Sequence, residues 1–215
     1  MSSPDASPAD RPPFPLGVVL FTAAYMVAAG IGAVVRGNTE FLFYIAVMLV
    51  LIGLMAVVDR RVQLSRFALW GLSLWGLAHM VGGLVPVPES WPIDGDIRVF
   101  YSWWIIPRFL KYDHIVHAAG FGITTVVCWE AMCAAVEGIT GRPKATIPPR
   151  LGLLVLCAAA GMGFGALNEV IEFVATLLVP KTNVGGYANT GWDLVSNLVG
   201  AVIAMVGLRI WKGRE

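Results

Sequence analysis

Residues 163–180 read GFGALNEVIEFVATLLVP, a stretch apolar enough to cross a lipid bilayer. Within it lie Asn168, Glu169 and Glu172. Residues three apart share one face of a helix, so the two glutamates point in the same direction. A carboxylate that faces lipid is costly, and such residues almost always face the interior of a helix bundle. The stretch therefore predicts a membrane helix with a polar, functional face.

The whole chain has the composition of a membrane protein. Its 215 residues are 57% hydrophobic and only 13% charged, whereas soluble domains are about 25% charged. Its mean hydropathy is +0.73. The net charge of +1 provides no basic surface for nucleic acid. We therefore expect an integral membrane protein that lies in the lipid bilayer and has no nucleic-acid partner.

Six apolar segments are long enough to span a bilayer. In lipid the backbone of each segment must satisfy its own hydrogen bonds, so all six are expected to be helices. They lie at roughly 16–35, 41–58, 67–86, 113–136, 151–179 and 191–210. The predicted fold class is all-α, a polytopic six-helix transmembrane bundle formed by residues 15–215 as a single domain. Residues 1–14 are rich in proline, serine and aspartate, and we expect them to be a disordered tail.

Lysine and arginine gather in three regions, namely the loops after the second and fourth helices and the C-terminal tail. These residues are Arg60, Arg61, Arg66, Arg142, Lys144, Arg150, Arg209, Lys212 and Arg214. Because cytoplasmic loops carry the excess of positive charge, we expect both termini in the cytoplasm of a multi-pass protein of the inner (plasma) membrane. The longest connection, residues 87–112, lies at the opposite end and is rich in aromatic residues. It is expected to be either an interfacial anchor or a lid over whatever the helices hold.

Polar residues of four helices lie at one depth, near the end opposite to the basic loops. Glu172 lies seven residues before Val179, which places it roughly 10 Å below the helix end at 1.5 Å per residue. The full set is His79, Asp113, His117, Glu169, Glu172, Asp193 and Asn197. Its four carboxylates would cost about 10 kcal/mol in lipid if left uncompensated, so they must share protons, a cation, water or a metal. The first two helices are expected to carry no site residue.

The fourth and sixth helices open with a similar pattern. The matching positions, at an offset of 80 residues, are Tyr112 with Trp192, Asp113 with Asp193, His117 with Asn197, and Gly120 with Gly200. The pattern suggests that helix hairpins 3–4 and 5–6 form a parallel repeat about an axis along the membrane normal. Chance similarity between short motifs is the alternative.

Two imidazoles with several carboxylates form a ligand set suited to Zn, Mn or Fe. The expected metal ligands are His79, Asp113, His117 and Asp193. Glu169 or Glu172 would then act as the general base. The residues expected to orient these groups or to contact substrate are Asn168, Asn197, Tyr112 and Arg108. The alternatives are a cavity that handles protons or cations, and a hydrogen-bonded network that only holds the helices together.

Four motifs resemble the YjdF-like bacterial membrane proteins. They are HMVGG at 79–83, YDHIVHAAGFG at 112–122, NEVIEF at 168–173 and GWDLVSNLVGA at 191–201. The likeness covers roughly residues 65–210, and the last helix also resembles the VanZ-like group, which is associated with glycopeptide tolerance. The chain departs from the YjdF-like pattern at His114, where the relatives have arginine, and at Asn197, where they often have another acid. The resemblance implies the fold and the polar cluster, and it implies no particular reaction.

Three functions remain open from the sequence. The first is an intramembrane metal-dependent hydrolase or transferase that acts on a lipid-linked substrate, with the metal activating water. The second is a small carrier coupled to protons or cations, which needs a polar path through the whole membrane. The third is a non-enzymatic scaffold or subunit. The inner halves of the third, fifth and sixth helices are nearly free of polar residues, and this favours a one-sided site over a conduit.

Overall fold

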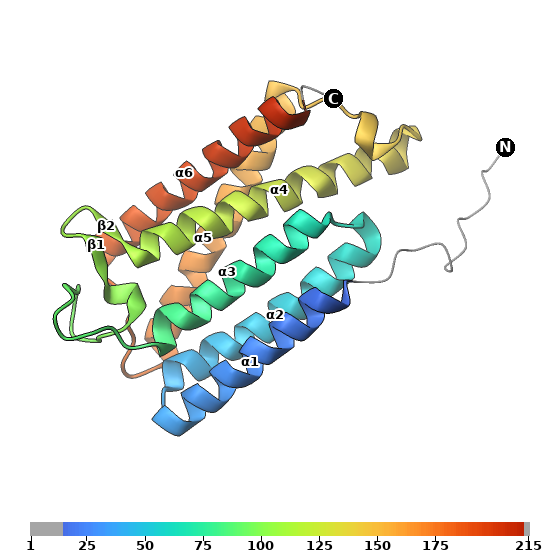
Figure 1. Cartoon of the computed structure of the whole chain (residues 1–215). Helices are drawn as coiled ribbons and strands as arrows, with labels where there is room; N and C mark the ends of the chain where they lie inside the picture. Colours follow the sequence, from blue (N-terminus) through green and yellow to red (C-terminus); the bar gives the residue numbers. More distant parts are fainter. Residues whose placement is uncertain (1–14, 213–215) are drawn as a thin grey trace.

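The computed structural model describes residues 15–212, which form six long helices (Figure 1). Their bounds are α1 Leu16–Arg36, α2 Thr39–Val62, α3 Arg66–Leu84, α4 Tyr112–Thr140, α5 Leu151–Leu178 and α6 Tyr187–Lys212. Each helix is long and apolar enough to cross a membrane. The prediction of an all-α bundle with six spans is therefore confirmed. The tail predicted for residues 1–14 lies outside the described residues.

Several helices extend beyond the predicted bounds, because they continue into polar turns where the apolar run has ended. α2 begins after Asn38, whose Oδ1 accepts a hydrogen bond from the Phe41 backbone N at 3.0 Å. Such a cap satisfies one of the free N–H groups of a first helical turn. α1 and α4 end at Gly37 and Gly141, whose φ angles are 61° and 69°. Glycine adopts this left-handed conformation without strain and so ends a helix cleanly.

Helices α4, α5 and α6 pack together, and α3 joins them to α1 and α2 (Figure 1). Glycines allow the closest approaches. A Cβ built on Gly200 of α6 would clash with the carbonyl oxygen of Ala118 in α4, and one built on Gly122 would lie 3.1 Å from the oxygen of Gly200. A Cβ on Gly165 of α5 would lie 2.6 Å from Nδ2 of Asn197. Small residues of this kind let membrane helices approach closely, and here they bring both α4 and α5 against α6.

The basic loops meet at one end of the bundle, as the sequence predicts. Nζ of Lys144, in the short 3₁₀ helix η3 (Lys144–Thr146), donates to the carbonyl oxygens of Val62 at 2.8 Å and Gln63 at 2.7 Å. Arg209 of α6 donates to the carbonyl oxygen of Pro149 at 2.8 Å. These bonds join the α2–α3 loop, the α4–α5 loop and the end of α6. We call this the basic end; its place in the cytoplasm stays a prediction.

The half of the bundle nearest the basic end is packed with apolar side chains. Its buried core joins α4, α5 and the loop between them and consists of Trp129, Cys133, Ile147, Leu154 and Cys157. Glu130 of α4, close to this core, accepts a hydrogen bond from the Ser65 backbone N at 2.7 Å and so caps α3. We call this region the inner plug.

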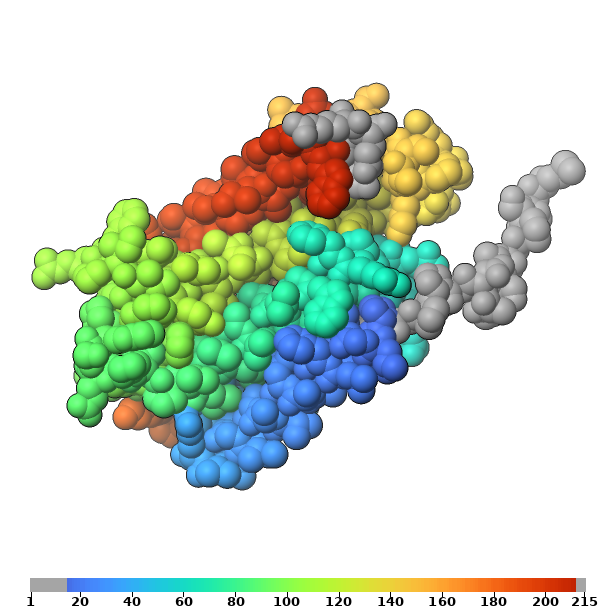
Figure 2. All heavy atoms as spheres, in the orientation of Figure 1, coloured from blue at the N-terminus to red at the C-terminus, as the bar shows by residue number. Residues whose placement is uncertain are grey.

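The connection from α3 to α4 is folded onto the opposite end of the bundle (Figures 1 and 2). It contains the 3₁₀ helix η2 (Phe100–Ser102) and two short antiparallel strands, β1 (Trp104–Ile106) and β2 (Leu110–Lys111). Its aromatic rings pack on one another, with the Trp91 and Trp103 centroids 4.3 Å apart. The sequence predicts an aromatic segment here but not its two strands, which the hairpin turn at Arg108 joins.

Candidate metal centre

Four carboxylates surround one imidazole near the start of α4. Nε2 of His117 lies 3.6 Å from Oδ1 of Asp113, 3.8 Å from Oε1 of Glu172 and 4.0 Å from Oδ1 of Asp193. Nδ1 of His117 lies 3.8 Å from Oε1 of Glu169. Helix α4 supplies the histidine and one aspartate, α5 both glutamates and α6 the second aspartate. We call these five residues the His117 cluster.

The spacing of these atoms suits a metal ion. Asp113, His117 and Asp193 form one group of possible ligands, and His117, Glu169 and Glu172 form another. In each group the ligand atoms lie within 4.8 Å of one another. Around a tetrahedral Zn²⁺ with bonds of about 2.0–2.2 Å, the ligand atoms are about 3.3–3.6 Å apart. The distances of 3.6–4.0 Å from His117 Nε2 need only a small contraction to reach this range.

Several buried polar atoms of the cluster lack a hydrogen-bond partner. Among residues 15–212 no partner is found for either carboxylate oxygen of Glu169, for Oδ1 of Asp193 or for Nδ2 of Asn197. The side chain of Asp193 is fully buried, and that of Glu169 is 9% exposed. Buried polar groups are nearly always hydrogen-bonded, and buried charges are paired or bind metals. These atoms therefore indicate a cation or protons at the cluster.

Amide side chains hold the cluster in place. Nδ1 of His117 lies 3.1 Å from Oδ1 of Asn197. When Nδ1–H donates this bond, the lone pair of Nε2 is free and faces three carboxylates, as a metal ligand requires. Asn168 donates to Oε1 of Glu172 at 2.7 Å, and Asn189 donates to Oδ2 of Asp193 at 2.6 Å. The sequence predicts such a role for Asn168 and Asn197 but not for Asn189, which lies one turn before Asp193.

A buried lysine stands at the edge of the cluster. Lys111 is 5% exposed, and its Nζ lies 3.8 Å from Oδ2 of Asp113 and 3.5 Å from Oδ2 of Asp94. It also donates a hydrogen bond to Oδ1 of Asn189. One lysine against the four carboxylates of the cluster leaves a formal charge of −3 around His117. That excess favours a divalent cation.

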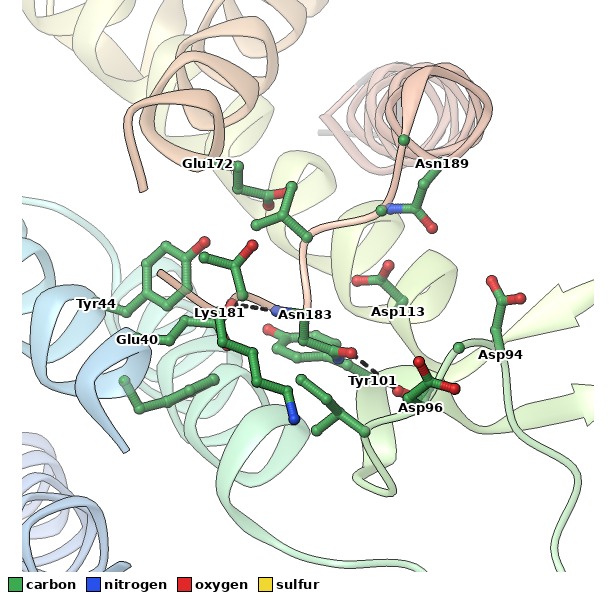
Figure 3. Close-up of a pocket in the computed structure, with 18 of the residues that line it drawn as sticks. Glu40, Tyr44, Asp94, Asp96, Tyr101, Asp113, Glu172, Lys181, Asn183 and Asn189 are labelled. Carbon is green, nitrogen blue, oxygen red and sulfur yellow. Dashed lines mark hydrogen bonds between the residues drawn. The ribbon is translucent and has the colours of Figure 1, made fainter. Parts of the chain in front are cut away.

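A cavity of about 660 Å³ opens from the cluster toward the α3–α4 connection (Figure 3). Asp113 and Glu172 of the cluster line it, whereas Glu169 and Asp193 are not among its lining residues. This volume is within the range of small-molecule sites. Its other walls come from the start of α2, from η2 and from the loop between α5 and α6. The residues they contribute include Glu40, Phe41, Tyr44, Tyr101, Ser102, Lys181, Thr182 and Asn183.

The sequence predicts no site residue in the first two helices, but α2 contributes three residues to the wall of this cavity. The predicted second helix began at residue 41, which left Glu40 in a loop. In the structure Glu40 lies in the first turn of α2, is 6% exposed, and faces the cavity. The helix dipole favours an acidic residue in the first turn of any helix. In the sequence, Glu40 therefore resembled an ordinary helix start. Only the contact of Glu40 with Asn183, in the loop between α5 and α6, distinguishes it.

His79 lies on the cavity wall but in neither group of possible ligands. Its Nδ1 is hydrogen-bonded to the hydroxyl of Tyr101 in η2. Burial, together with the nearby Asp113 carboxylate, raises the pKa of the Tyr101 phenol well above its usual value, so the hydroxyl stays protonated. The structure thus places His79 on the cavity wall, whereas His117 is not among the residues that line the cavity. Its role as a ligand stays a prediction.

Tyr112 and Arg108 also lie outside the cluster. The Tyr112 hydroxyl donates to the carbonyl oxygen of Ala78 at 3.0 Å and so ties α4 to α3. Arg108 is exposed at the turn between β1 and β2, with a φ of 62°. Neither is among the residues that line the cavity, and a substrate contact by either stays a prediction.

The comparisons with known proteins identify a family and nothing narrower. A family model described as "Predicted membrane protein (DUF2238)" matches residues 14–214. Neither the search of curated proteins nor the search of solved structures returned a match. The match agrees with the membrane bundle, and the finer resemblance to YjdF-like and VanZ-like proteins stays an expectation.

Proposed function

We propose, from the premise that this chain belongs to the DUF2238 family of predicted membrane proteins, that it is a metal-dependent membrane enzyme. The His117 cluster would bind a divalent metal ion, and the reaction would be hydrolysis or group transfer on a lipid-linked substrate. One observation carries the proposal. Four carboxylates meet a single imidazole in a buried site, and oxygen atoms of two of them have no hydrogen-bond partner within the described chain.

Asp113, His117 and Asp193 are the proposed ligands. Asp113 and His117 are four residues apart on α4, so their side chains project from one face. Asp193 comes from α6, which the glycine contacts hold against α4. A nitrogen ligand with two carboxylates suits Zn, Mn or Fe. A bound ion of this kind lowers the pKa of its water toward neutrality and supplies a nucleophile.

Glu172 is the proposed general base. Unlike Glu169, it lines the cavity, and it lies 3.8 Å from Nε2 of His117. Asn168 holds one of its oxygens at 2.7 Å, which fixes the carboxylate and leaves the second oxygen to take a proton. A general base must lie within hydrogen-bond reach of the group that it deprotonates. Glu172 meets this requirement because it lies at the border between the His117 cluster and the cavity. Glu169, buried on the Nδ1 side of His117, would balance the charge of the ion.

The one-sided shape of the site favours an enzyme over a carrier. The cavity is lined by residues from the end opposite to the basic loops. Between the His117 cluster and the basic end lies the inner plug, whose apolar side chains are buried. A carrier needs polar groups along both halves of its path. A site reached from one side fits a substrate held in one leaflet.

Metal content is the direct test of the proposal. The protein would be purified in mild detergent without added chelator, and its metals would be measured by elemental mass spectrometry. We expect about one Zn, Mn or Fe per chain, lost in His117→Ala and in Asp193→Asn. Glu89→Gln is the matched control, because Glu89 is an exposed acid of the α3–α4 connection and does not line the cavity. A wild-type protein that binds no metal after exposure to each ion would overturn the proposal.

A turnover assay distinguishes the general base from the metal ligands. Purified protein would be incubated with a lipid extract, and released headgroups would be followed by mass spectrometry. Glu172→Gln keeps a hydrogen-bond acceptor for Asn168 and should retain the metal, but it should lower turnover by about 10²–10⁴-fold. Full turnover with intact metal in this variant would exclude Glu172 as the base. The same comparison for Glu169→Gln tests whether the deeper glutamate has that role instead.

A further inference from the structure

One wall of the cavity is built from aromatic rings beside a carboxylate. Phe41 and Tyr44 of α2, His79 of α3 and Tyr101 of η2 all line it. Their ring centroids lie 5.6 Å apart for Phe41 and Tyr44, 5.7 Å for Tyr44 and His79, and 5.5 Å for His79 and Tyr101. With Glu40 these residues are called the Glu40 wall. Figure 3 shows Tyr44 and Glu40 on the side of the cavity away from Asn189, and Tyr101 nearer its centre.

Glu40 is a buried carboxylate whose charge no cation of the described residues neutralises. Its side chain accepts a hydrogen bond from the Asn183 backbone N at 2.9 Å. No lysine or arginine nitrogen lies within 4.0 Å of it in the part of the chain that the structure covers. The first helical turn and one N–H group offset part of the cost of burial. A buried carboxylate is normally paired with a cation as well, so the Glu40 wall lacks the positive partner that its chemistry predicts.

The cavity as a whole carries an excess of negative charge. Its charged lining residues are Glu40, Asp94, Asp96, Asp113, Glu172, Lys111 and Lys181. Lys111 is already held by Asp94 and Asp113. Even when a metal ion compensates Asp113 and the deeper Asp193, the lining acids Glu40, Asp96 and Glu172 outnumber the one other lysine, Lys181. A ligand that enters this cavity is therefore expected to bring positive charge to it.

We propose that the Glu40 wall binds an ammonium group of the substrate. Aromatic faces attract a cation through the negative charge of their π-systems, and they do so most strongly for ammonium ligands in desolvated sites. Glu40 adds a full negative charge on the same wall. The substrate class that follows is a lipid whose headgroup carries an amine or a quaternary ammonium. The role of this lipid as a substrate rests on the proposed function, but the binding of its ammonium group does not.

The test uses tetramethylammonium chloride as the probe and full-length protein in detergent. Saturation-transfer NMR would report protein contact through the methyl protons of the probe, with tert-butanol as a neutral compound of similar size. Glu40→Gln keeps an acceptor for the Asn183 N–H and removes the charge. Tyr44→Leu removes a ring, whereas Tyr44→Phe keeps it. Tyr187→Leu is the control, because Tyr187 is 95% exposed at the start of α6.

We expect a methyl signal for tetramethylammonium that Glu40→Gln and Tyr44→Leu each weaken at least about fivefold in affinity. Tyr44→Phe and Tyr187→Leu should leave the affinity unchanged. An equal signal from tert-butanol, no signal in the wild type, or unchanged affinity in Glu40→Gln would each overturn the proposal. Metal content is measured on the same samples. Metal without ammonium binding refutes this inference alone, and ammonium binding without metal refutes only the proposed metal centre.

Discussion

The substitution Gly200→Ala tests whether glycine contacts between α4 and α6 hold the metal centre together. A Cβ at this position would clash with the carbonyl oxygen of Ala118, which is backbone and cannot turn away. A carbon and a carbonyl oxygen keep about 3.3 Å apart, so the two helices must separate by roughly 1.4 Å. Gly207→Ala is the matched control on the same helix, because nothing lies within 4 Å of a Cβ there.

The expected size of the effect follows from the difference between these two variants. Both replace a helical glycine and gain about 1 kcal/mol of helix propensity, which cancels in the comparison. Overpacking costs about 1–3 kcal/mol, and in a chain of this size 1 kcal/mol lowers Tm by about 2–4 °C. We therefore expect Gly200→Ala to melt roughly 2–12 °C below Gly207→Ala, measured by tryptophan fluorescence in detergent.

Metal content gives a second, independent result for the same pair. Separation of α4 from α6 would lengthen the 3.1 Å bond between His117 Nδ1 and Asn197 Oδ1 beyond the range of a hydrogen bond. Gly200→Ala should thus lose metal that Gly207→Ala keeps. Equal Tm values and equal metal content in the two variants would refute the reasoning that close helix contact positions the centre.

Three further predictions test other parts of the structure. Asn197→Leu removes the acceptor that orients His117 and should weaken metal affinity by about 10–100-fold in a competition titration, whereas Asn197→Asp should weaken it much less. Glu130→Gln should leave metal content and turnover unchanged, because Glu130 caps α3 at the far side of the inner plug; loss of turnover would favour a carrier instead. In Lys181→Cys, an impermeant thiol reagent should label the new cysteine from outside intact cells. In Lys144→Cys, it should label the new cysteine only after lysis. The reverse pattern would invert the predicted orientation.

The height of the site along the bundle could be predicted from the sequence, but its position around each helix axis could not. Counting residues from the helix ends places Glu172, Asp193 and His79 at a similar height along the bundle, because the rise per residue is fixed. The rotation of α3 depends on its packing against neighbours, and it turns His79 toward Tyr101 instead of toward His117. Spacing along one helix was more reliable, since Asp113 and His117 needed only the helical period to share a face.

Residues supplied by connections were the hardest to predict. Asn183 lies in a short polar loop whose sequence indicates only a turn, yet it bonds Glu40 of α2 and Ser102 of η2. Those contacts join segments more than 80 residues apart, so no local pattern contains them. The predicted alternatives for residues 87–112, an anchor or a lid, did not anticipate that η2 itself would supply Tyr101 to a cavity wall.

The inner plug has a consequence for the membrane potential. Because apolar packing closes the bundle toward the basic end, an ion that reaches His117 from the cavity crosses only part of the electric field. At roughly 10 Å into an apolar layer of about 30 Å, a third of the field is an upper bound. For a full crossing the work is about 2.3 kcal/mol per charge at 100 mV, so a divalent ion here gains or loses at most about 1.5 kcal/mol. The metal affinity of the centre should accordingly differ by no more than roughly tenfold between energised and de-energised cells.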